Sequence, residues 1–257
     1  MRFVVVLVWV LAGAAQAADD AASLALIRVR QGLYAGPSVV RGNLSFRAPS
    51  ARVETRLDAV PALTLGGDLW PQPELGLFFS ARIGLGADLA VPDSNVTVAY
   101  NLHQLEAGGR YRWYLGPRAD AVALLAGLAL RGTIQTVQVQ RPAFLVDRSA
   151  LGPELQVGVA WPIAGWRLWV QATAAVGKPF FVREGPTDSG DPQAFASYGG
   201  QLMVVAGLTE RFGIQAQLDA RAVDLSFTGE GTRAGGIVDG TVADRFLTAD
   251  LLVRYQF

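Results

Sequence analysis

Long stretches of the chain alternate between apolar residues and small or polar ones. In residues 75–89 the odd positions are all apolar, whereas the even positions hold mainly glycine, serine or charged residues. Successive side chains of a β-strand point to opposite faces, so this period of two predicts a strand with one apolar face. Soluble strands usually run to about 5–6 residues, and a tilted strand that crosses a bilayer needs about 10. The alternation therefore favours a strand that spans a membrane.

The same alternation recurs in further segments. They are residues 52–69, 103–115, 151–161, 166–176 and 213–223. Residues 121–135 and 198–209 are more apolar on both faces, but they keep Arg131 and Gln201 in the small or polar phase. Strands in lipid satisfy every backbone group only when the sheet closes on itself. The pattern therefore predicts an all-β fold, an antiparallel up-and-down transmembrane β-barrel.

Composition favours this barrel over a soluble β-sandwich. The chain is 51% hydrophobic and 17% charged, with a mean hydropathy of +0.29. Beyond the N-terminal segment, no stretch reaches the ~18 apolar residues of a membrane helix. Lys178 is the only lysine, although a water-facing surface normally carries lysine freely, and arginine is better suited to buried paired charge. Aromatic residues gather at the expected strand ends, as at a membrane interface: Trp70, Trp113, Tyr114, Trp161, Trp166 and Tyr255.

The remaining composition excludes several function classes. Basic and acidic residues balance at 22 each, which argues against a nucleic-acid partner. The absence of cysteine excludes disulfide scaffolds, iron–sulfur clusters and thiol catalysis. His103 is the only histidine, which argues against a multi-histidine metal site. We therefore expect no metal and no cofactor.

The N-terminus has the pattern of a secretory signal peptide. Residues 1–17 combine Arg2, an apolar run at residues 3–11 and the small residues of Ala15-Gln16-Ala17. This order predicts Sec-type export and cleavage after Ala17. The mature protein would then be a single barrel domain, residues 18–257.

The C-terminus carries a family resemblance. The chain ends in Phe257, and alternate positions before it are Tyr255, Val253 and Leu251. This pattern resembles the closing strand of Gram-negative outer-membrane β-barrel proteins, in which that strand is the signal read by the barrel assembly machinery. The whole mature chain resembles small uncharacterised proteobacterial barrels of this kind. The resemblance implies location in the outer membrane, contact with its lipid, and an assembly role for these four residues, but no reaction.

Turn signals predict the number of strands. Short turns are expected at residues 70–74, 115–118, 162–165 and 210–213, and longer loops at residues 43–50, 91–101, 137–149, 181–197 and 228–243. Short periplasmic turns alternating with long external loops are typical of outer-membrane barrels. These connections predict ten strands with both termini in the periplasm. The first strand is expected at residues 24–34, with a bulge at residues 35–37 before residues 39–46, and this leaves barrels of eight or twelve strands open.

The polar phase of these strands predicts a charged interior. Its members are Arg28, Arg30, Glu54, Arg56, Asp58, Arg82, Asp88, Glu106, Arg110, Arg112, Arg131, Glu154, Arg167, Asp219, Arg221, Asp250 and Arg254. Small barrels fill their interiors with side chains, and buried opposite charges must pair. A salt-bridged plug is therefore favoured. The excess of arginine leaves a narrow, anion-preferring pore as the alternative.

No constellation of residues points to catalysis. Asp93 and His103 lie near one expected loop, but no motif matches an omptin-type protease, and His103 lacks the nearby serine of barrel phospholipases. The acidic loop at residues 183–192 misses the spacing of an EF-hand. We therefore expect a non-enzymatic barrel with a structural or surface role. The alternatives are a small ion or solute channel, and an adhesin-like protein that acts through residues 181–197 and 228–243. The ligand stays unknown.

Overall fold

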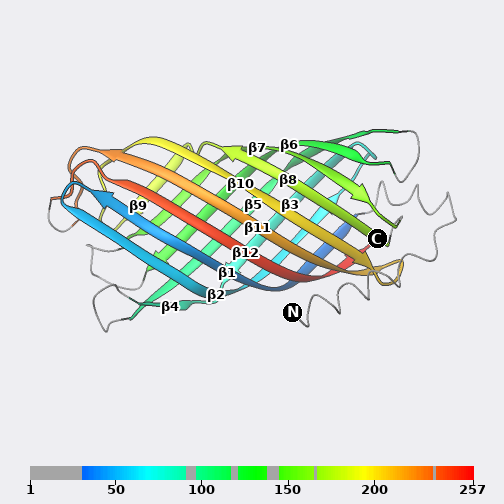
Figure 1. Cartoon of the computed structure of the whole chain (residues 1–257), viewed down its shortest axis with the longest axis horizontal. Coiled ribbons are helices and arrows are strands. Elements are labelled where there is room, and N and C mark those ends of the chain that lie inside the picture. Colours follow the sequence, from blue (N-terminus) through cyan, green and yellow to red (C-terminus); the bar gives the residue numbers. More distant parts are fainter. Residues whose placement is uncertain (1–30, 91–96, 117–120, 138–144, 165–166, 234–235) are drawn as a thin grey trace.

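The computed structural model describes residues 31–90, 97–116, 121–137, 145–164, 167–233 and 236–257, and these residues form a β-barrel (Figure 1). The strands are β1 (Gly32–Ala48), β2 (Ala51–Leu69), β3 (Leu75–Gly84), β4 (Ala87–Ala90), β5 (Thr97–Tyr114), β6 (Ala123–Val137), β7 (Asp147–Pro162), β8 (Leu168–Gly177), β9 (Phe181–Gly185), β10 (Asp191–Gly207), β11 (Phe212–Thr228) and β12 (Thr241–Gln256). Within the described residues no helix is long and apolar enough to cross a membrane. The predicted signal peptide and Arg28 and Arg30 lie outside the described residues.

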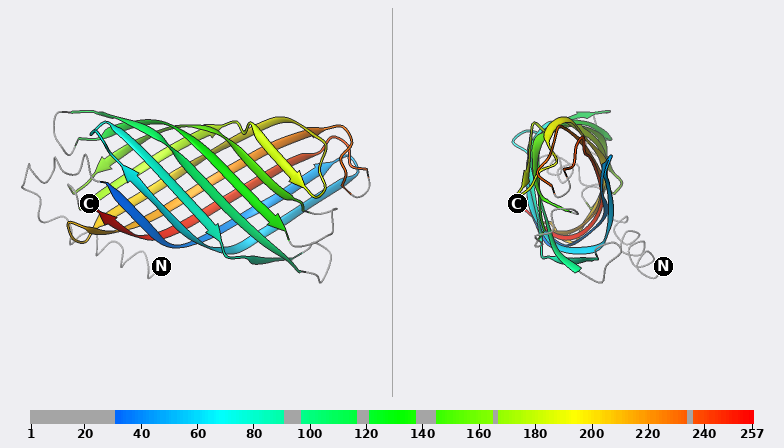
Figure 2. Two further views of the ribbon diagram at one scale, coloured as in Figure 1. Left: turned by 180° about the vertical axis from the view of Figure 1, so that it is seen from behind. Right: turned by 90° about the vertical axis from the view of Figure 1, so that its left-hand side faces the viewer.

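The wall closes because β1 pairs with both β2 and β12, all antiparallel. The remaining order follows the chain, with β3 and β4 both paired to β5, and β8 and β9 both paired to β7. β3 and β4 are thus two parts of one interrupted wall strand, and β8 and β9 are two parts of another. With each interrupted strand counted once, ten strands form the wall, as predicted. The barrel is oval when seen along its axis (Figure 2).

The two ends of the barrel differ. One end, here called the turn end, carries residues 70–74 and 208–211 together with the end of β12. The opposite end, here called the loop end, carries residues 49–50, 186–190 and 229–240. The described parts of all four predicted short turns lie at connections between consecutive wall strands, although Pro162, Phe212 and Gly213 belong to the strands themselves. Several predicted loops are shorter than expected, because the strands continue into them. Residues 43–50, for example, are mostly strand and end in a tight turn at residues 49–50.

Apolar side chains cover the outside of the wall. Exposed leucines, valines and isoleucines lie on every wall strand, among them Leu33, Leu63, Leu77, Leu105, Leu128, Val157, Val176, Leu202, Leu218 and Leu251. Exposed aromatic side chains lie at the turn end: Tyr111, Trp113, Trp161, Phe212, Tyr255 and Phe257. These residues confirm the outward apolar face and an aromatic girdle. Of the predicted aromatic residues, Trp113, Trp161 and Tyr255 belong to this girdle. Trp70 is buried and Tyr114 lies in the inward phase of β5, so neither belongs to it, and Trp166 lies outside the described residues.

Two irregularities change which face of a strand points inward. Opposite β1, the register shifts between Val40 and Gly42, so that Asp58 and Ala59 on β2 together oppose Arg41. This is a β-bulge, and it reverses the inward phase along the outer part of β2. At the break between β3 and β4, Gly86 takes a positive φ of 93°, and the phase reverses again. The bulge predicted at residues 35–37 is wrong, because β1 passes these residues without a register shift.

Candidate functional site: the side-chain network inside the barrel

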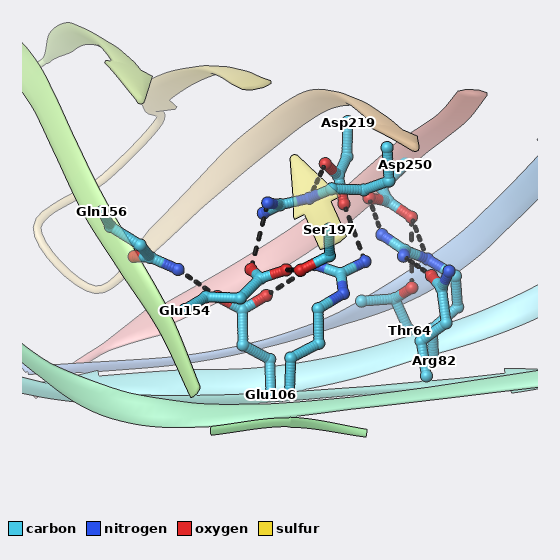
Figure 3. A network of polar contacts seen from close by, with 11 residues as sticks. Thr64, Arg82, Glu106, Glu154, Gln156, Ser197, Asp219 and Asp250 are labelled. Carbon is cyan, nitrogen blue, oxygen red and sulfur yellow. Dashed lines mark hydrogen bonds and ion pairs between the residues drawn. The ribbon is translucent and has the colours of Figure 1, made fainter. Parts of the chain in front are cut away.

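Inward-facing side chains form polar contacts across the middle of the barrel (Figure 3). Arg82 on β3 donates to both carboxylate oxygens of Asp250 on β12, from Nη2 at 2.7 Å and from Nε at 3.2 Å. β1 and β2 separate these strands in the wall, so the pair crosses the interior. Thr64 donates to the same carboxylate at 3.1 Å, and Arg82 also donates to Gln104. The Arg82 and Asp250 side chains are only 5% and 0% exposed.

A second group of five charged residues joins four strands. Arg131 on β6 contacts Glu106 on β5 at 3.1 Å and Asp219 on β11 at 3.5 Å. Arg221 on β11 contacts Asp219 at 2.9 Å and Glu154 on β7 at 3.0 Å. The chain of contacts therefore runs from β5 through β6 and β11 to β7. Removing one member would leave a buried charge without its partner, which is strongly unfavourable.

Uncharged side chains complete this second group. Ser197 Oγ donates to Glu154 at 3.1 Å, and Gln156 Nε2 donates to Glu106 at 2.5 Å. Figure 3 shows both residues pointing toward the carboxylates that they contact. Buried carboxylates need such additional donors, because one ion pair does not use all their acceptor positions. The network therefore provides these buried charges with partners from the protein itself.

Trp70 closes the interior at the turn end. Its side chain lies just beyond β2, is buried, and packs under the guanidinium of Arg112, which lies 3.3 Å from the ring centroid. Nearby, Arg254 contacts Asp68 at 2.8 Å, and Arg110 contacts the same carboxylate at 3.8 Å. Cation–π and ion-pair contacts thus hold a layer of side chains across this mouth.

A third group of charges lies at the loop end. Arg148 on β7 contacts Asp244 on β12 at 2.6 Å and Glu184 on β9 at 3.2 Å. From the loop at residues 229–240, Arg233 contacts Glu184 at 3.5 Å and lies 3.9 Å from the ring centroid of Phe46. Burial lowers the pKa of Arg233 to about 10, against the opposing effect of Glu184. Arg233 therefore remains charged at neutral pH.

Apolar side chains also fill the interior toward the loop end. One cluster consists of Val40, Leu44, Leu57, Val60, Leu89, Val98, Tyr100, Leu102 and Phe246. A second consists of Phe46, Val53, Leu225, Phe227, Ile237 and Val242. Ile237 belongs to the loop at residues 229–240, so this loop contributes to the core. Such clusters resemble the core of a soluble protein more than the lining of an aqueous channel.

Two loops at this end are joined by hydrogen bonds. The backbone N–H of Asp188 donates to Thr232 Oγ1 at 2.9 Å, and the N–H of Thr232 donates to Asp188 Oδ1 at 3.0 Å. The N–H of Arg233 donates to the carbonyl of Asp188 at 3.2 Å. Ser189 donates to Glu184 from both its N–H and its hydroxyl. Residues 186–190 and the described residues 229–233 and 236–240 thus form one connected layer, here called the loop cap.

Small cavities lie between these groups. One cavity of about 40 Å³ is bounded by Arg131, Glu154 and Arg221 of the second charge group together with Arg148 and Pro179. Another of about 40 Å³ lies between the Arg82 group and Tyr34. Each has room for only a few water molecules.

Metal-binding side chains do not cluster within the described residues. No group of three or more histidine, aspartate or glutamate side chains could hold a metal ion in the part of the chain that the structure describes. His103 on β5 shares the outward phase with the exposed Leu105, away from the interior carboxylates. Asp93 lies outside the described residues.

Ten residues of the predicted interior set face the inside of the barrel. Arg82, Glu106, Arg110, Arg112, Arg131, Glu154, Asp219, Arg221, Asp250 and Arg254 all face inward. Arg167 lies in the connection between β7 and β8, not within a strand. Four predictions are wrong, because the phase reversals at the β2 bulge and at Gly86 turn these residues outward: Glu54, Arg56, Asp58 and Asp88. On β2, the side chains of Glu54, Arg56 and Asp58 are 51%, 78% and 86% exposed, respectively.

Sequence reasoning missed five interior charges. These are Asp68, Arg148, Glu184, Arg233 and Asp244. Asp68 lies in the phase that the pattern assigned to the interior, near the end of β2, but it was not included in the predicted set. The other four lie in or next to segments predicted as loops, where no strand phase was assigned. With these corrections, the described interior holds eight arginines, if Arg167 is left aside, against seven acids, and the predicted positive excess nearly disappears.

The residues of the predicted assembly signal share one face. Leu251, Val253 and Tyr255 on β12, and Phe257 just beyond it, are exposed on the outside of the wall at the turn end. Phe212 on β11 lies 5.3 Å from Tyr255 between ring centroids, and Tyr255 lies 6.2 Å from Phe257. Their recognition by an assembly machinery stays a prediction.

Comparison with known proteins identifies the fold. No family model and no curated protein sequence matches the chain. Among solved structures, the outer membrane protease OmpT from Escherichia coli is similar over 89% of this chain and 97% of its own, with a TM-score of 0.57 and 8% identity. The outer membrane protein OprG from Pseudomonas aeruginosa matches over 89% and 96% of the two chains, with a TM-score of 0.40 and 12% identity. The attachment invasion locus protein Ail of Yersinia pestis matches over 89% and 99%, with a TM-score of 0.33 and 10% identity. At these identities the likeness concerns architecture alone, and the chain has the fold of the Gram-negative outer-membrane β-barrel proteins.

Proposed function

We propose that the protein is a non-conducting, non-enzymatic outer-membrane barrel with a structural or surface role. The observation that carries this proposal is the filling of the interior. Among the described residues, three groups of paired charges, two apolar clusters and the side chains packed around Trp70 occupy the interior. The cavities between them hold only a few waters each.

A permeating ion would have to displace these contacts. The pairs Arg82–Asp250 and Arg148–Asp244 each cross the interior, and their side chains are almost fully buried. Separating such a pair exposes two charges to a poorly hydrated interior, which is strongly unfavourable. Small barrels are generally filled in this way, whereas open aqueous channels need about 16 strands.

The proposal includes the route to the membrane. Residues 1–17 would direct export, and the exposed face of Leu251, Val253, Tyr255 and Phe257 would be recognised by the barrel assembly machinery. The apolar outer wall would then contact outer-membrane lipid. The similarity of the fold to outer-membrane proteins supports this location.

Planar-bilayer conductance of refolded residues 18–257 tests the proposal. A folded barrel, recognised by its heat-modifiable migration, should give no stable openings at neutral pH. Discrete, reproducible openings would overturn the proposal and place the small channel first. The double variant Arg131→Ala/Arg221→Ala provides a positive control, because it removes both cations of the second charge group and should introduce leak currents.

One observation favours a second candidate, recognition through the external loops. Hydrogen bonds join the two segments of the loop cap into one layer. The side chains of Ile237 and Arg233, which belong to this cap, reach into the barrel, where Ile237 joins an apolar cluster and Arg233 contacts Glu184. An ordered surface loses less entropy on binding than a flexible one. Adherence of expressing cells to immobilised host-matrix proteins would test it, with the Asp188→Ala variant as the comparison. Equal adherence of the variant, the wild type and cells that lack the protein would exclude this candidate.

A further inference from the structure

A groove on the outside of the barrel concentrates arginine near the loop end. The groove has a volume of about 330 Å³ and lies across β1, β2 and β12, which are neighbours in the wall (Figure 1). Arg41, Arg56 and Arg245 line it, together with Asn43 and Leu247. Strand register places Asn43 directly opposite both Arg56 and Arg245, and Arg41 opposite Leu247. The three arginines therefore come from adjacent strands at nearly the same height, although the Arg245 guanidinium turns toward Asp224 on β11.

The groove lies at the edge of the apolar outer surface. From Arg245 toward the turn end, the outward positions of β12 are Leu247, Ala249, Leu251, Val253 and Tyr255, and none is charged. At ~3.4 Å per residue and a tilt of ~40°, the distance from Arg245 to Tyr255 along the barrel axis is about 26 Å. The apolar band of a membrane barrel is about 25 Å tall. Since Tyr255 lies in the aromatic girdle at one membrane interface, this distance places the groove at the opposite membrane interface.

The β2 bulge explains why Arg56 contributes to this groove. Without Asp58 and Ala59 opposing the single residue Arg41, the outer part of β2 would keep the phase of Leu63 and Leu65. Arg56 would then face inward. The bulge instead turns Arg56 outward beside Asn43, while Leu57 enters the apolar core. The β-bulge that breaks the simple alternation of β2 therefore also places Arg56 in the groove.

The charge of the groove is positive. Arg41 has no acidic partner among the residues that the structure describes. Arg56 pairs with Asp58 at 3.0 Å, and Arg245 pairs with Asp224 at 2.7 Å, but neither acid lines the groove. Guanidinium groups bind phosphate through paired, charge-assisted hydrogen bonds. Below the arginines, Val39, Leu63 and Leu247 present an apolar surface on the same three strands.

We propose that this groove binds the phosphate group of an outer-leaflet lipid, with the acyl chains of that lipid lying along β1, β2 and β12. Cations at the edge of an apolar surface match an amphiphile that carries its anionic phosphate at the membrane interface. The proposal depends on the placement of the barrel in a membrane. It does not depend on whether the interior conducts, so the conductance experiment and this one can fail separately.

Native mass spectrometry of the detergent-solubilised barrel tests the proposal with two probes. One is bisphosphorylated lipid A, and the other is the same lipid with both phosphates removed. The wild type should retain the phosphorylated lipid at least tenfold more strongly. The double variant Arg41→Gln/Arg56→Gln should lose this preference, whereas the single variant Arg41→Gln should weaken it.

A matched control comes from the same hairpin. Arg47 and Arg52 lie on β1 and β2 outside the groove, with side chains 59% and 66% exposed. The double variant Arg47→Gln/Arg52→Gln removes the same charge and should keep the preference for the phosphorylated lipid. Equal retention of the two lipids by the wild type, or equal loss in the two double variants, would overturn the proposal. So would complete displacement of the lipid by 10 mM inorganic phosphate, because that result would indicate a site for free anions.

Discussion

Arg82 and Asp250 lie on β3 and β12, two strands that are not neighbours in the wall, and their side chains meet across the interior with an Nη2–Oδ2 distance of 2.7 Å. Arg131 with Asp219, Arg221 with Glu154 and Arg148 with Asp244 also join non-adjacent strands. Such contacts connect opposite parts of the barrel, which hydrogen bonds between neighbouring strands cannot do. The polar network therefore stabilises the cross-section of the barrel as well as filling it.

The Arg82–Asp250 pair can be tested by a double-mutant cycle. Asp250→Leu alone should lower the free energy of unfolding by about 3 kcal/mol, because it leaves a buried guanidinium without its carboxylate. The double variant Arg82→Met/Asp250→Leu should recover most of this loss, since it removes both charges. Denaturant unfolding in detergent micelles gives the measurement. Additive losses in the double variant would contradict the assigned pairing.

Single cysteines can test the phase reversal at the β2 bulge. The chain contains no cysteine, so each introduced thiol is the only one present. A thiol at Arg56→Cys should react rapidly with a membrane-impermeant maleimide, whereas one at Leu57→Cys should be protected, because Leu57 is buried. The pair Asp88→Cys and Leu89→Cys should behave in the same way. Protection at position 56 with labelling at position 57 would show that the simple alternation continues through β2, and it would contradict the phase reversal at the bulge.

Closure of the turn end depends on a glycine. A Cβ at Gly76 would lie 2.5 Å from the Trp70 ring, so Gly76→Ala should displace that ring from Arg112. We expect a loss of about 1–3 kcal/mol in the free energy of unfolding, with a red shift of tryptophan emission. Gly109→Ala is the control, since the nearest atoms to its Cβ would lie 3.7 Å away. Similar losses in both variants would show that backbone effects dominate.

The role of the last residue in assembly can be tested in cells. Phe257→Ala should reduce the amount of folded protein in the outer membrane several-fold, because it removes the final aromatic of the predicted assembly signal. Phe212→Ala is a matched control, since it removes another exposed aromatic side chain at the same end, on the neighbouring strand β11. Fractionation followed by a heat-modifiability assay gives the measurement. Normal delivery of the Phe257 variant would show that the signal lies elsewhere.

The loop cap should loosen when Asp188 is removed. Its Oδ1 accepts hydrogen bonds from the N–H groups of Thr232 and Gly190. Asp188→Ala should therefore speed proteolysis and amide hydrogen exchange within residues 186–190 and 229–240 by several-fold, without changing exchange in β1 or β12. Asp191→Ala, a change at an exposed position nearby, should leave these rates unchanged. Unchanged exchange in the Asp188 variant would show that other contacts hold the cap.

Local sequence patterns correctly predicted which side chains face inward along regular strands whose outer face is apolar. The alternation of β3 and β12 correctly placed Arg82, Asp250 and Arg254 inside and Leu251 and Val253 outside. The same reasoning was wrong for Glu54, Arg56 and Asp58, because the segments of β2 on the two sides of the bulge have opposite inward phases. No local signal marked Asp58 and Ala59 as the bulge, since it is defined by their register against Arg41 on another strand.

The sequence by itself determined an antiparallel barrel with an apolar outside and a charged inside, and it favoured ten wall strands over eight or twelve. Period two and the spacing of the turns are local properties, and closure follows from the need to pair every backbone group in lipid. Only the tertiary structure decided which charges meet. Arg148 joins Asp244, and Arg131 joins Asp219, because barrel closure and register bring distant strands across one narrow interior. The burial of Trp70 at one end and of Ile237 at the other was likewise decided there, since a side chain enters the core only where neighbouring strands leave space for it.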